Sequence, residues 1–285
     1  MEIHYAGGNT AEMVVYNMDL HPLLDKELTK PTKWMKLTEL SWHFLAGSIY
    51  HQANGRPFSN DLIIFLVQQQ AYFTPNFPIF LEKIKSNRDS NHEYSIKLIH
   101  TMEKIKTSSA VYSTKLLDQH SDVVLATFVS YMVMVDLSTR KSSPFPPAVK
   151  NYIEEHSASK SLLDEIPQQT KPMKAFPSDA QIYRWSRKVV AFDTNASHTS
   201  HTFYLGFCLE CLGCALKDGI PVDLDKPIHE AIVEKYNIII EKESCLGQMS
   251  TISMYQSQDK YFNFIISVED KNIAYLCMNF FRNLK

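Results

Sequence analysis

The stretch from His51 to Leu81 reads HQANGRPFSNDLIIFLVQQQAYFTPNFPIFL, and it decides which fold the sequence predicts. Its opening run, Asn54-Gly55-Arg56-Pro57, is typical of a break between two elements. Ser59 then stands where the N-cap of a helix is expected. The apolar residues that follow suit one face of a helix extending to Phe73, and Pro75 stops or kinks it. The stretch therefore predicts a helix bounded by two breaks.

Apolar residues recur at helical spacing in most other windows of the chain. Only eight of 285 residues are glycine, whereas all-β folds with many tight turns normally use more. We therefore predict an all-α, multi-helix bundle forming a single domain over residues 1–285, with a long irregular insertion at about 138–178. The predicted helices are 37–51, 59–73, 93–117, 123–137, 148–155, 178–189, 201–217, 228–242 and 259–284, the last either continuous or broken near Asp270.

Composition excludes several classes of protein. Hydrophobic residues make up 45% and charged residues 21%, as in ordinary globular proteins. The net charge of −2 and the dispersed basic residues argue against nucleic-acid binding. No signal peptide and no transmembrane stretch is recognisable, and the five cysteines are an odd number, so we expect a soluble cytoplasmic protein with reduced thiols and no membrane partner.

The 51–81 stretch resembles the second and third helices of the heme-oxygenase-like superfamily, which includes thiaminase II, the pyrroloquinoline quinone synthase type and non-heme di-iron oxidases. The matching elements are Asn54-Gly55, Ser59, Phe65-Leu66-Val67-Gln68, Tyr72-Phe73 and Phe77-Pro78. The resemblance implies a helical-bundle enzyme acting on a small organic molecule, with non-heme iron as the candidate cofactor. Thiaminase activity is disfavoured, because Gln69 stands where that family has an aspartate and 123–137 contains no cysteine.

Glu210 is a carboxylate within the apolar run 203–216, where a buried charge is costly unless it is paired or bound to a metal. In the resemblance, a core acid on such a helix faces the active cavity. Glu210 and Tyr72 are therefore the candidate catalytic residues. The neighbouring Cys208, Cys211 and Cys214 match neither a zinc site nor a redox motif, and we interpret them as core residues.

Imidazoles and carboxylates that converge from facing helices are the ligands expected for non-heme iron. His100 and Glu103 lie three residues apart and would share a face of the predicted 93–117 helix. His198 and His201 have the same spacing, at a predicted helix start. The candidate metal ligands are His100, Glu103, Glu210 and His229; for each, a surface or capping role is the alternative.

Three consecutive glutamines, Gln68 to Gln70, cannot all face outward on a helix. Gln69 and Tyr72 would share the apolar face, where they could bind a polar ligand or bond to each other. Gln68, Gln69 and Tyr131 are the candidate ligand-binding residues.

Two functions of different kinds follow from these patterns. The first is a heme-oxygenase-like oxidoreductase acting on a small-molecule substrate. The second is a non-catalytic helical protein that binds a ligand or a protein partner, with 142–147 as its contact loop and the metal lost. An unrelated all-α fold is a third interpretation. Aromatic residues in the predicted last helix, Tyr275, Phe280 and Phe281, suggest a homodimer.

Overall fold

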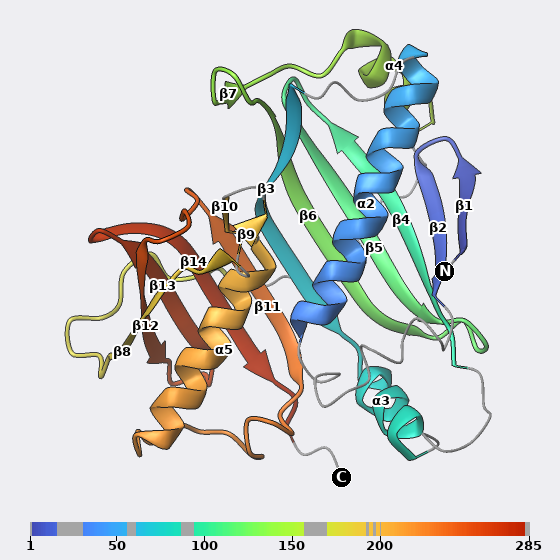
Figure 1. The fold of residues 1–285 in the computed structure, drawn as a ribbon. Helices are drawn as coiled ribbons and strands as arrows, with labels where there is room; N and C mark the ends of the chain where they lie inside the picture. Colours follow the sequence, from blue (N-terminus) through green and yellow to red (C-terminus); the bar gives the residue numbers. More distant parts are fainter. Residues whose placement is uncertain are drawn as a thin grey trace. The chain divides into compact units, whose positions relative to one another are not determined.

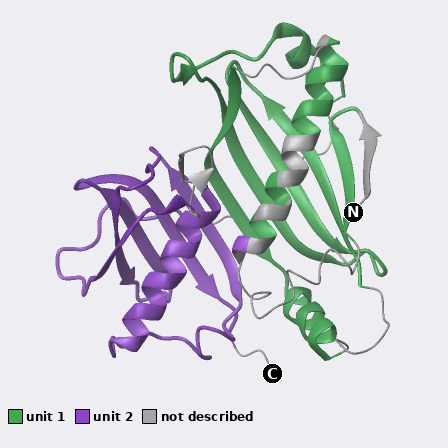
Figure 2. Ribbon diagram, in the orientation of Figure 1, with its two compact units in different colours: residues 1–28, 33–167 green, residues 29–32, 168–285 purple. Residues whose placement is uncertain are grey.

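The computed structural model describes residues 2–15, 31–55, 61–86, 94–156, 170–191, 194–195, 198–199 and 201–282. Antiparallel sheet dominates this part of the chain, so the predicted all-α, heme-oxygenase-like bundle is wrong. The chain forms two compact units, one of residues 1–28 and 33–167, the other of residues 29–32 and 168–285 (Figure 2). The boundary falls within the segment predicted as an insertion, and the assignment of 1–285 to a single domain stays a prediction.

Unit 1 is a long helix lying along one face of an antiparallel sheet (Figure 1). The strand order is β1-β2-β4-β5-β6-β3, and the short β7 pairs with β6. Its strands are β1 (Glu2–Gly7), β2 (Thr10–Val15), β3 (Leu62–Phe73), β4 (Ile96–Ile105), β5 (Ser109–Asp118), β6 (Val124–Asp136) and β7 (Lys141–Ser142), and its helices are α2 (Pro31–Asn54), α3 (Asn76–Ser86) and α4 (Pro147–His156).

The face of the unit 1 sheet toward α2, called here the inward face, is defined by strand alternation. Every second residue of β6 from Ala126 to Met134 is buried on this face. One core cluster unites these strands with Leu45 and Ile49 of α2 and with Val149 of α4. A bulge at Val67, where Leu66 and Gln68 pair with consecutive residues of β6, keeps the inward face of β3 in register.

Unit 2 repeats the design on a smaller scale, with α5 lying against a sheet of order β11-β14-β13-β12-β8 (Figure 1). A separate two-stranded hairpin, β9 with β10, precedes the helix. The elements are β8 (Tyr183–Lys188), β9 (Thr194–Asn195), β10 (His198–Thr199), α5 (His201–Lys217), β11 (Val233–Ile240), β12 (Met249–Gln256), β13 (Phe262–Val268) and β14 (Lys271–Phe280).

Three of the predicted helices are confirmed: α2, α4 and α5 cover 37–51, 148–155 and 201–217. The other predicted helices contain strands. Residues 59–73 contain β3, 93–117 contain β4 and most of β5, 123–137 contain β6, 178–189 contain β8, 228–242 contain β11, and 259–284 contain β13 and β14. Short runs rich in apolar residues suit a buried strand as well as a buried helix, which is why the periodicity misled.

None of the helices in the described ranges is long and apolar enough to cross a membrane.

Candidate functional site

A band of polar side chains crosses the inward face of the unit 1 sheet. Gln69, Tyr112, Thr114, Ser130 and His100 are each at most 4% exposed. Their strands bring them together: His100 pairs with Thr114, Tyr112 with Ser130, and Ser130 with Gln69. We call these five residues the polar band. It runs diagonally over β4, β5, β6 and β3, between apolar rows.

His100 is the ionisable group at one end of the polar band. Its Nδ1 is hydrogen-bonded to the Thr114 hydroxyl, and its ring stacks on Tyr112 with centroids 5.8 Å apart. Burial lowers the pKa of His100 to about 3, so the imidazole is neutral at pH 7. Burial also raises the pKa of Tyr112, which stays protonated. The band is therefore uncharged and offers hydrogen bonds rather than charge.

The start of α5 is the second concentration of polar residues. The β9–β10 hairpin places Asn195 opposite His198 in backbone register, and α5 begins at His201 soon after. Thr202, in the first turn, is 1% exposed. An α-helix carries partial positive charge at its N-terminus, which stabilises a developing negative charge nearby. Residues of the histidine and asparagine types next to such a terminus suit acid–base chemistry on a carbonyl compound.

Two polar contacts hold α5 against the rest of unit 2. The Tyr204 hydroxyl accepts a hydrogen bond from the backbone N–H of Ser244, 2.7 Å away, and both residues are fully buried. On the outer side, the Arg187 guanidinium of β8 lies 4.4 Å from the centroid of the Phe207 ring. Its Nη1 also forms a 2.8 Å ion pair with Glu210. Together with the buried face of the helix, these contacts hold α5 and its N-terminus in place.

The structure places Glu210 at the surface of α5, with its side chain 51% exposed. The inward orientation predicted from the apolar run is wrong, because Cys208 and Cys211 occupy the buried face instead, each 0% exposed. The core interpretation of these two cysteines is thereby confirmed, while Cys214 is half-buried. Glu210 is balanced by Arg187 and needs no metal to offset its charge.

Gln69 lies in the core as predicted, but for a different reason. In a strand, residues three apart point to opposite faces, so Tyr72 is separated from Gln69 by the sheet. Gln69 donates from Nε2 to the Ser130 hydroxyl at 3.0 Å. Gln68 and its cross-strand partner Tyr131 lie on the outward face and are half-buried. The four predicted residues are thus divided between two faces, and their roles in binding or catalysis stay predictions.

The predicted iron ligands are likewise not brought together as predicted. His100 is on the inward face of β4, whereas Glu103 accepts a hydrogen bond from Ser113 on the outward face. His229 precedes β11 in a turn and is 75% exposed, near Glu230. Among the residues that the structure describes, no three His, Cys, Asp or Glu side chains lie close enough to hold a metal ion. Non-heme iron as a cofactor stays a prediction.

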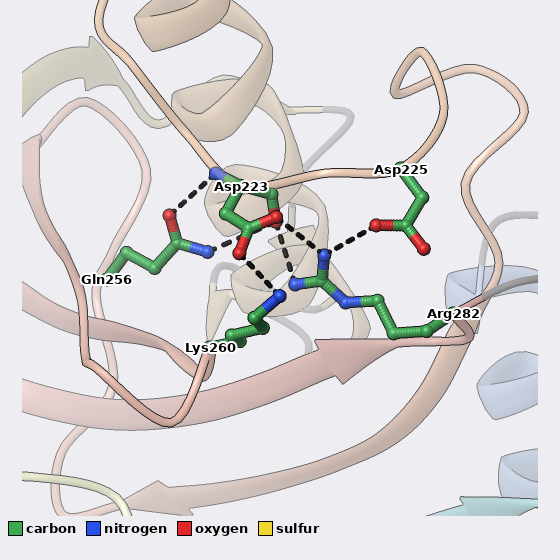
Figure 3. Close-up of polar contacts among 5 residues, drawn as sticks. All are labelled: Asp223, Asp225, Gln256, Lys260 and Arg282. Atoms are coloured by element: carbon green, nitrogen blue, oxygen red, sulfur yellow. Dashed lines mark hydrogen bonds and ion pairs between the residues drawn. The ribbon is translucent and has the colours of Figure 1, made fainter.

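A cluster of charged side chains on unit 2 forms a network of ion pairs. Arg282 Nη1 lies 2.8 Å from carboxylate oxygens of both Asp223 and Asp225, and Lys260 Nζ lies 2.8 Å from Asp223 (Figure 3). Gln256 accepts a hydrogen bond from the Asp223 backbone N–H. The cluster joins the loop after α5 to the β12–β13 turn and the end of β14, with its acids neutralised by its bases.

Comparison with solved structures identifies this architecture. A 12:0-ACP thioesterase from Umbellularia californica matches with a TM-score of 0.66 and 11% identity, over 97% of this chain and 99% of that chain. A putative oleoyl thioesterase from Lactobacillus plantarum gives 0.62 and 13%, over 95% of both chains. An acyl-ACP thioesterase from Bacteroides thetaiotaomicron gives 0.59 and 12%, over 87% and 89%. The chain has the hot-dog fold.

A hot-dog unit consists of a sheet curved around a central helix. The central helix is α2 in unit 1 and α5 in unit 2. At these identities the likeness establishes the fold alone. No family model and no curated protein matches the sequence.

Within the hot-dog fold, the candidate residue that the sequence analysis missed is Asn195. A signal was present, since the polar run 193–202 directly precedes the apolar run 203–216. The sequence predicts that His198 and His201 lie at a helix start; His201 does begin α5, whereas His198 lies on β10. The oxidoreductase and helical-binding hypotheses are both contradicted by a sheet-dominated hot-dog fold.

Proposed function

We propose that this protein is a hydrolase that cleaves acyl thioesters, with the acyl chain delivered on an acyl carrier protein. The observation on which the proposal rests is the match of both hot-dog units, in one chain and over almost its whole length, to structures named as thioesterases of acyl-ACP. No metal is required for this chemistry, because a thiolate is a good leaving group.

The start of α5 is the proposed reaction centre. Water adds to the thioester carbonyl, and the imidazole of His198 or His201 takes a proton from that water. The partial positive charge of the helix N-terminus stabilises the oxyanion that forms. The carbon–sulfur bond then breaks, the imidazolium returns its proton to the thiolate, and a free carboxylic acid and a thiol leave.

The test is release of thiol from dodecanoyl-ACP by the full chain. We expect turnover by the wild-type protein and a loss of about 10²–10⁴-fold in kcat for whichever of His198→Ala and His201→Ala removes the base. His229→Ala is the matched control, since its imidazole is exposed and distant in sequence from the start of α5. Asn195→Ala is expected to lower kcat as well, by a smaller factor.

Two outcomes contradict different parts of the proposal. If the wild-type chain releases no thiol from acyl-ACP or acyl-CoA of any length from medium to long, it is not a thioesterase. If it does, but both histidine variants match His229→Ala, the reaction centre lies elsewhere.

A further inference from the structure

Three large apolar side chains are exposed where β8 ends and β12 begins. Val190, Leu246 and Met249 are 46%, 53% and 54% exposed, and they make up half of the six exposed large apolar residues in the described ranges. Single exposed apolar residues are normal on a protein surface, whereas a group of them rimmed by polar residues indicates an interaction site. What matters is therefore whether these three residues share one surface.

Hydrogen bonds between β8 and β12 bring them together. Lys188 pairs with Met249, and the ladder continues one step beyond this pair. There the Val189 N–H donates to the Gln248 carbonyl, and the Val189 carbonyl accepts from the Gly247 N–H, both at 2.9 Å. Val190, the next residue, therefore lies beside the turn that leads into β12.

That turn exposes Leu246. The Gln248 N–H donates to the Cys245 carbonyl at 3.2 Å, and Gly247 has a φ of 88°. A left-handed third residue is typical of a type II turn, in which the second residue, here Leu246, lies at the outer corner. The turn and the adjoining ends of β8 and β12 are called here the β8–β12 corner.

The cations next to this corner point away from α5. Arg187 contacts Phe207 and Glu210 of α5, so strand alternation turns Lys188 and Arg184 to the opposite, outer face of the sheet. Both are exposed, and neither forms an ion pair with the residues that the structure describes. The outer-face residues are Arg184, Ser186 and Lys188 of β8 and Met249, Thr251 and Ser253 of β12, which comprise two cations and no acid.

Another part of the outer face is covered by the chain itself. The Thr170 carbonyl accepts hydrogen bonds from Asn237 of β11 and Cys277 of β14. The Phe176 ring lies 5.8 Å from that of Tyr255, near the far end of β12. The segment 170–176 therefore shields β11, β14 and the end of β12, while the β8–β12 corner stays exposed.

The β8–β12 corner lies at the same end of unit 2 as the start of α5. Ser244, two residues before Leu246, is hydrogen-bonded to Tyr204 in the first turn of α5. The chain that leaves β8 continues into the β9–β10 hairpin, which precedes α5. A carrier protein that presents a thioester to the start of α5 therefore has this surface next to it.

Resting on the proposed function, we propose that the β8–β12 corner and the outer face of β8 dock the acyl carrier protein. Carboxylates of the carrier face Arg184 and Lys188, and its apolar side chains cover Val190, Leu246 and Met249. A second copy of this chain fits less well, because a two-fold contact brings like charges together. The surface binds the carrier and takes no part in the bond cleavage.

The experiment compares dodecanoyl-ACP with dodecanoyl-pantetheine, which has the same thioester but no protein. We expect Lys188→Glu and Met249→Asp each to raise KM for dodecanoyl-ACP by about tenfold, with kcat changed less than about twofold. Neither should change kcat/KM for dodecanoyl-pantetheine by more than about twofold. Added salt should raise the KM of the wild type for dodecanoyl-ACP, and less so that of Lys188→Glu.

The matched controls make the same charge changes at the opposite end of unit 2. Lys226→Glu lies in the loop after α5 and Gln258→Asp in the β12–β13 turn, both at exposed residues. Both should keep the KM of the wild type for dodecanoyl-ACP. Met249→Ser adds no charge and should raise the same KM by a smaller factor, which tests the surface if Met249→Asp fails to fold.

The outcomes separate the docking surface from the proposed function. If the wild type hydrolyses dodecanoyl-ACP and the KM values of Lys188→Glu and Met249→Asp equal those of the controls, the docking surface is refuted and the thioesterase stands. If no thioester is hydrolysed, calorimetry with dodecanoyl-ACP should still show binding that is about tenfold weaker in both variants. Absence of binding by the wild type refutes the surface in that case too.

Two further results would assign the surface to another partner. Sedimentation may show a wild-type dimer that Met249→Asp breaks, which would make the surface a contact between two copies. Alternatively, the wild type but not Lys188→Glu would bind vesicles of phosphatidylcholine and phosphatidylglycerol, which would make it a lipid contact. Either result without a change in KM for dodecanoyl-ACP overturns the carrier proposal.

Discussion

The Tyr204 hydroxyl of α5 and the backbone N–H of Ser244 form a fully buried 2.7 Å hydrogen bond that ties the helix to the segment between β11 and β12. Removing the hydroxyl leaves that N–H without this acceptor. We expect Tyr204→Phe to lower the free energy of unfolding by about 1–3 kcal/mol. Urea denaturation measures this, and Tyr255→Phe is the control.

The control is informative because the hydroxyl of the half-buried Tyr255 makes no hydrogen bond within the described ranges. Its loss should change the unfolding free energy by less than about 0.5 kcal/mol. Equal effects of the two substitutions would mean that the Ser244 contact contributes nothing specific.

The buried imidazole of His100 predicts a pH dependence of stability. Its pKa is lowered to about 3 in the folded state, against 6.5 in the unfolded chain. Between these values the unfolded chain binds a proton that the folded chain does not, so stability falls as the pH falls from about 6.5 toward 3. The slope from this group is at most about 1.4 kcal/mol per pH unit.

The measurement is the unfolding free energy of the wild type and His100→Phe from pH 7.5 to 4.5. Carboxylates titrate in both proteins, so the difference between the two curves isolates the imidazole. We expect the unfolding free energy of the wild type, relative to that of His100→Phe, to decrease steadily as the pH falls below 6.5. Parallel curves would show that His100 is already accessible to protons in the folded state.

Part of the fold could be predicted from the sequence. The predicted limits of α5, 201–217, match the structure, and its two cysteines three apart, Cys208 and Cys211, are both buried on one face of the helix. In β6, by contrast, Phe128 and Met132 on the inward face alternate with Val129 and Val133, which are also apolar. Without polar residues on the outward face, the two-residue period is hidden.

The scarcity of glycine led to a wrong prediction of the fold class for a specific reason. Several turns are made by other residues in the left-handed region, namely Asp122, Arg140, Lys260, Glu269 and Asp270. These residues adopt that conformation at some cost, so a sheet protein can be built with few glycines. The number of glycines alone could not reveal that the chain is built from strands.

The candidate site was predictable only in part. The burial of Gln69 follows from its apolar neighbours in either fold. The separation of Gln69 from Tyr72, and of His100 from Glu103, depends on whether the segment is a strand or a helix. The pairing of Asn195 with His198 depends on the β9–β10 hairpin, which the short polar residues of this segment do not predict.

The Asp223 cluster on unit 2 predicts stability that depends on acid and salt. Hydrogen bonds from Lys260 and then from Arg282 hold the pKa of Asp223 below its ordinary 3.8 (Figure 3). A lowered carboxyl pKa contributes stability above pH 3.8, and this contribution is lost as the pH falls through the folded value. We expect Asp223→Asn to lower the melting temperature at pH 7, with the difference from wild type shrinking below pH 3.8.

Salt provides an independent check of the same cluster. The side chains are partly exposed, so added salt should reduce the effect of Asp223→Asn at pH 7. Asp179→Asn, an exposed acid with no ion pair in the described part of the chain, is the control and should leave the melting temperature unchanged at every pH. A salt-independent difference would show that the charge of Asp223 is not the source of the effect.

The turn between β13 and β14 can be made more stable. Glu269 and Asp270 have φ values of 52° and 60°, so both central residues of this two-residue hairpin are left-handed. Such turns favour asparagine followed by glycine, and other residues are strained in them. The double variant Glu269→Asn with Asp270→Gly should therefore raise the free energy of unfolding, measured in urea, by about 1 kcal/mol.

A glycine placed in the neighbouring β12–β13 turn is the matched control for this double variant. Gln258 has an ordinary φ, so Gln258→Gly relieves no strain and only adds freedom to the unfolded chain. It should lower the free energy of unfolding by about 0.5–1 kcal/mol. Opposite signs for the two variants mean that backbone conformation decides the outcome. A loss of stability in both would show that the side chain of Glu269 or Asp270 contributes more than the strain costs.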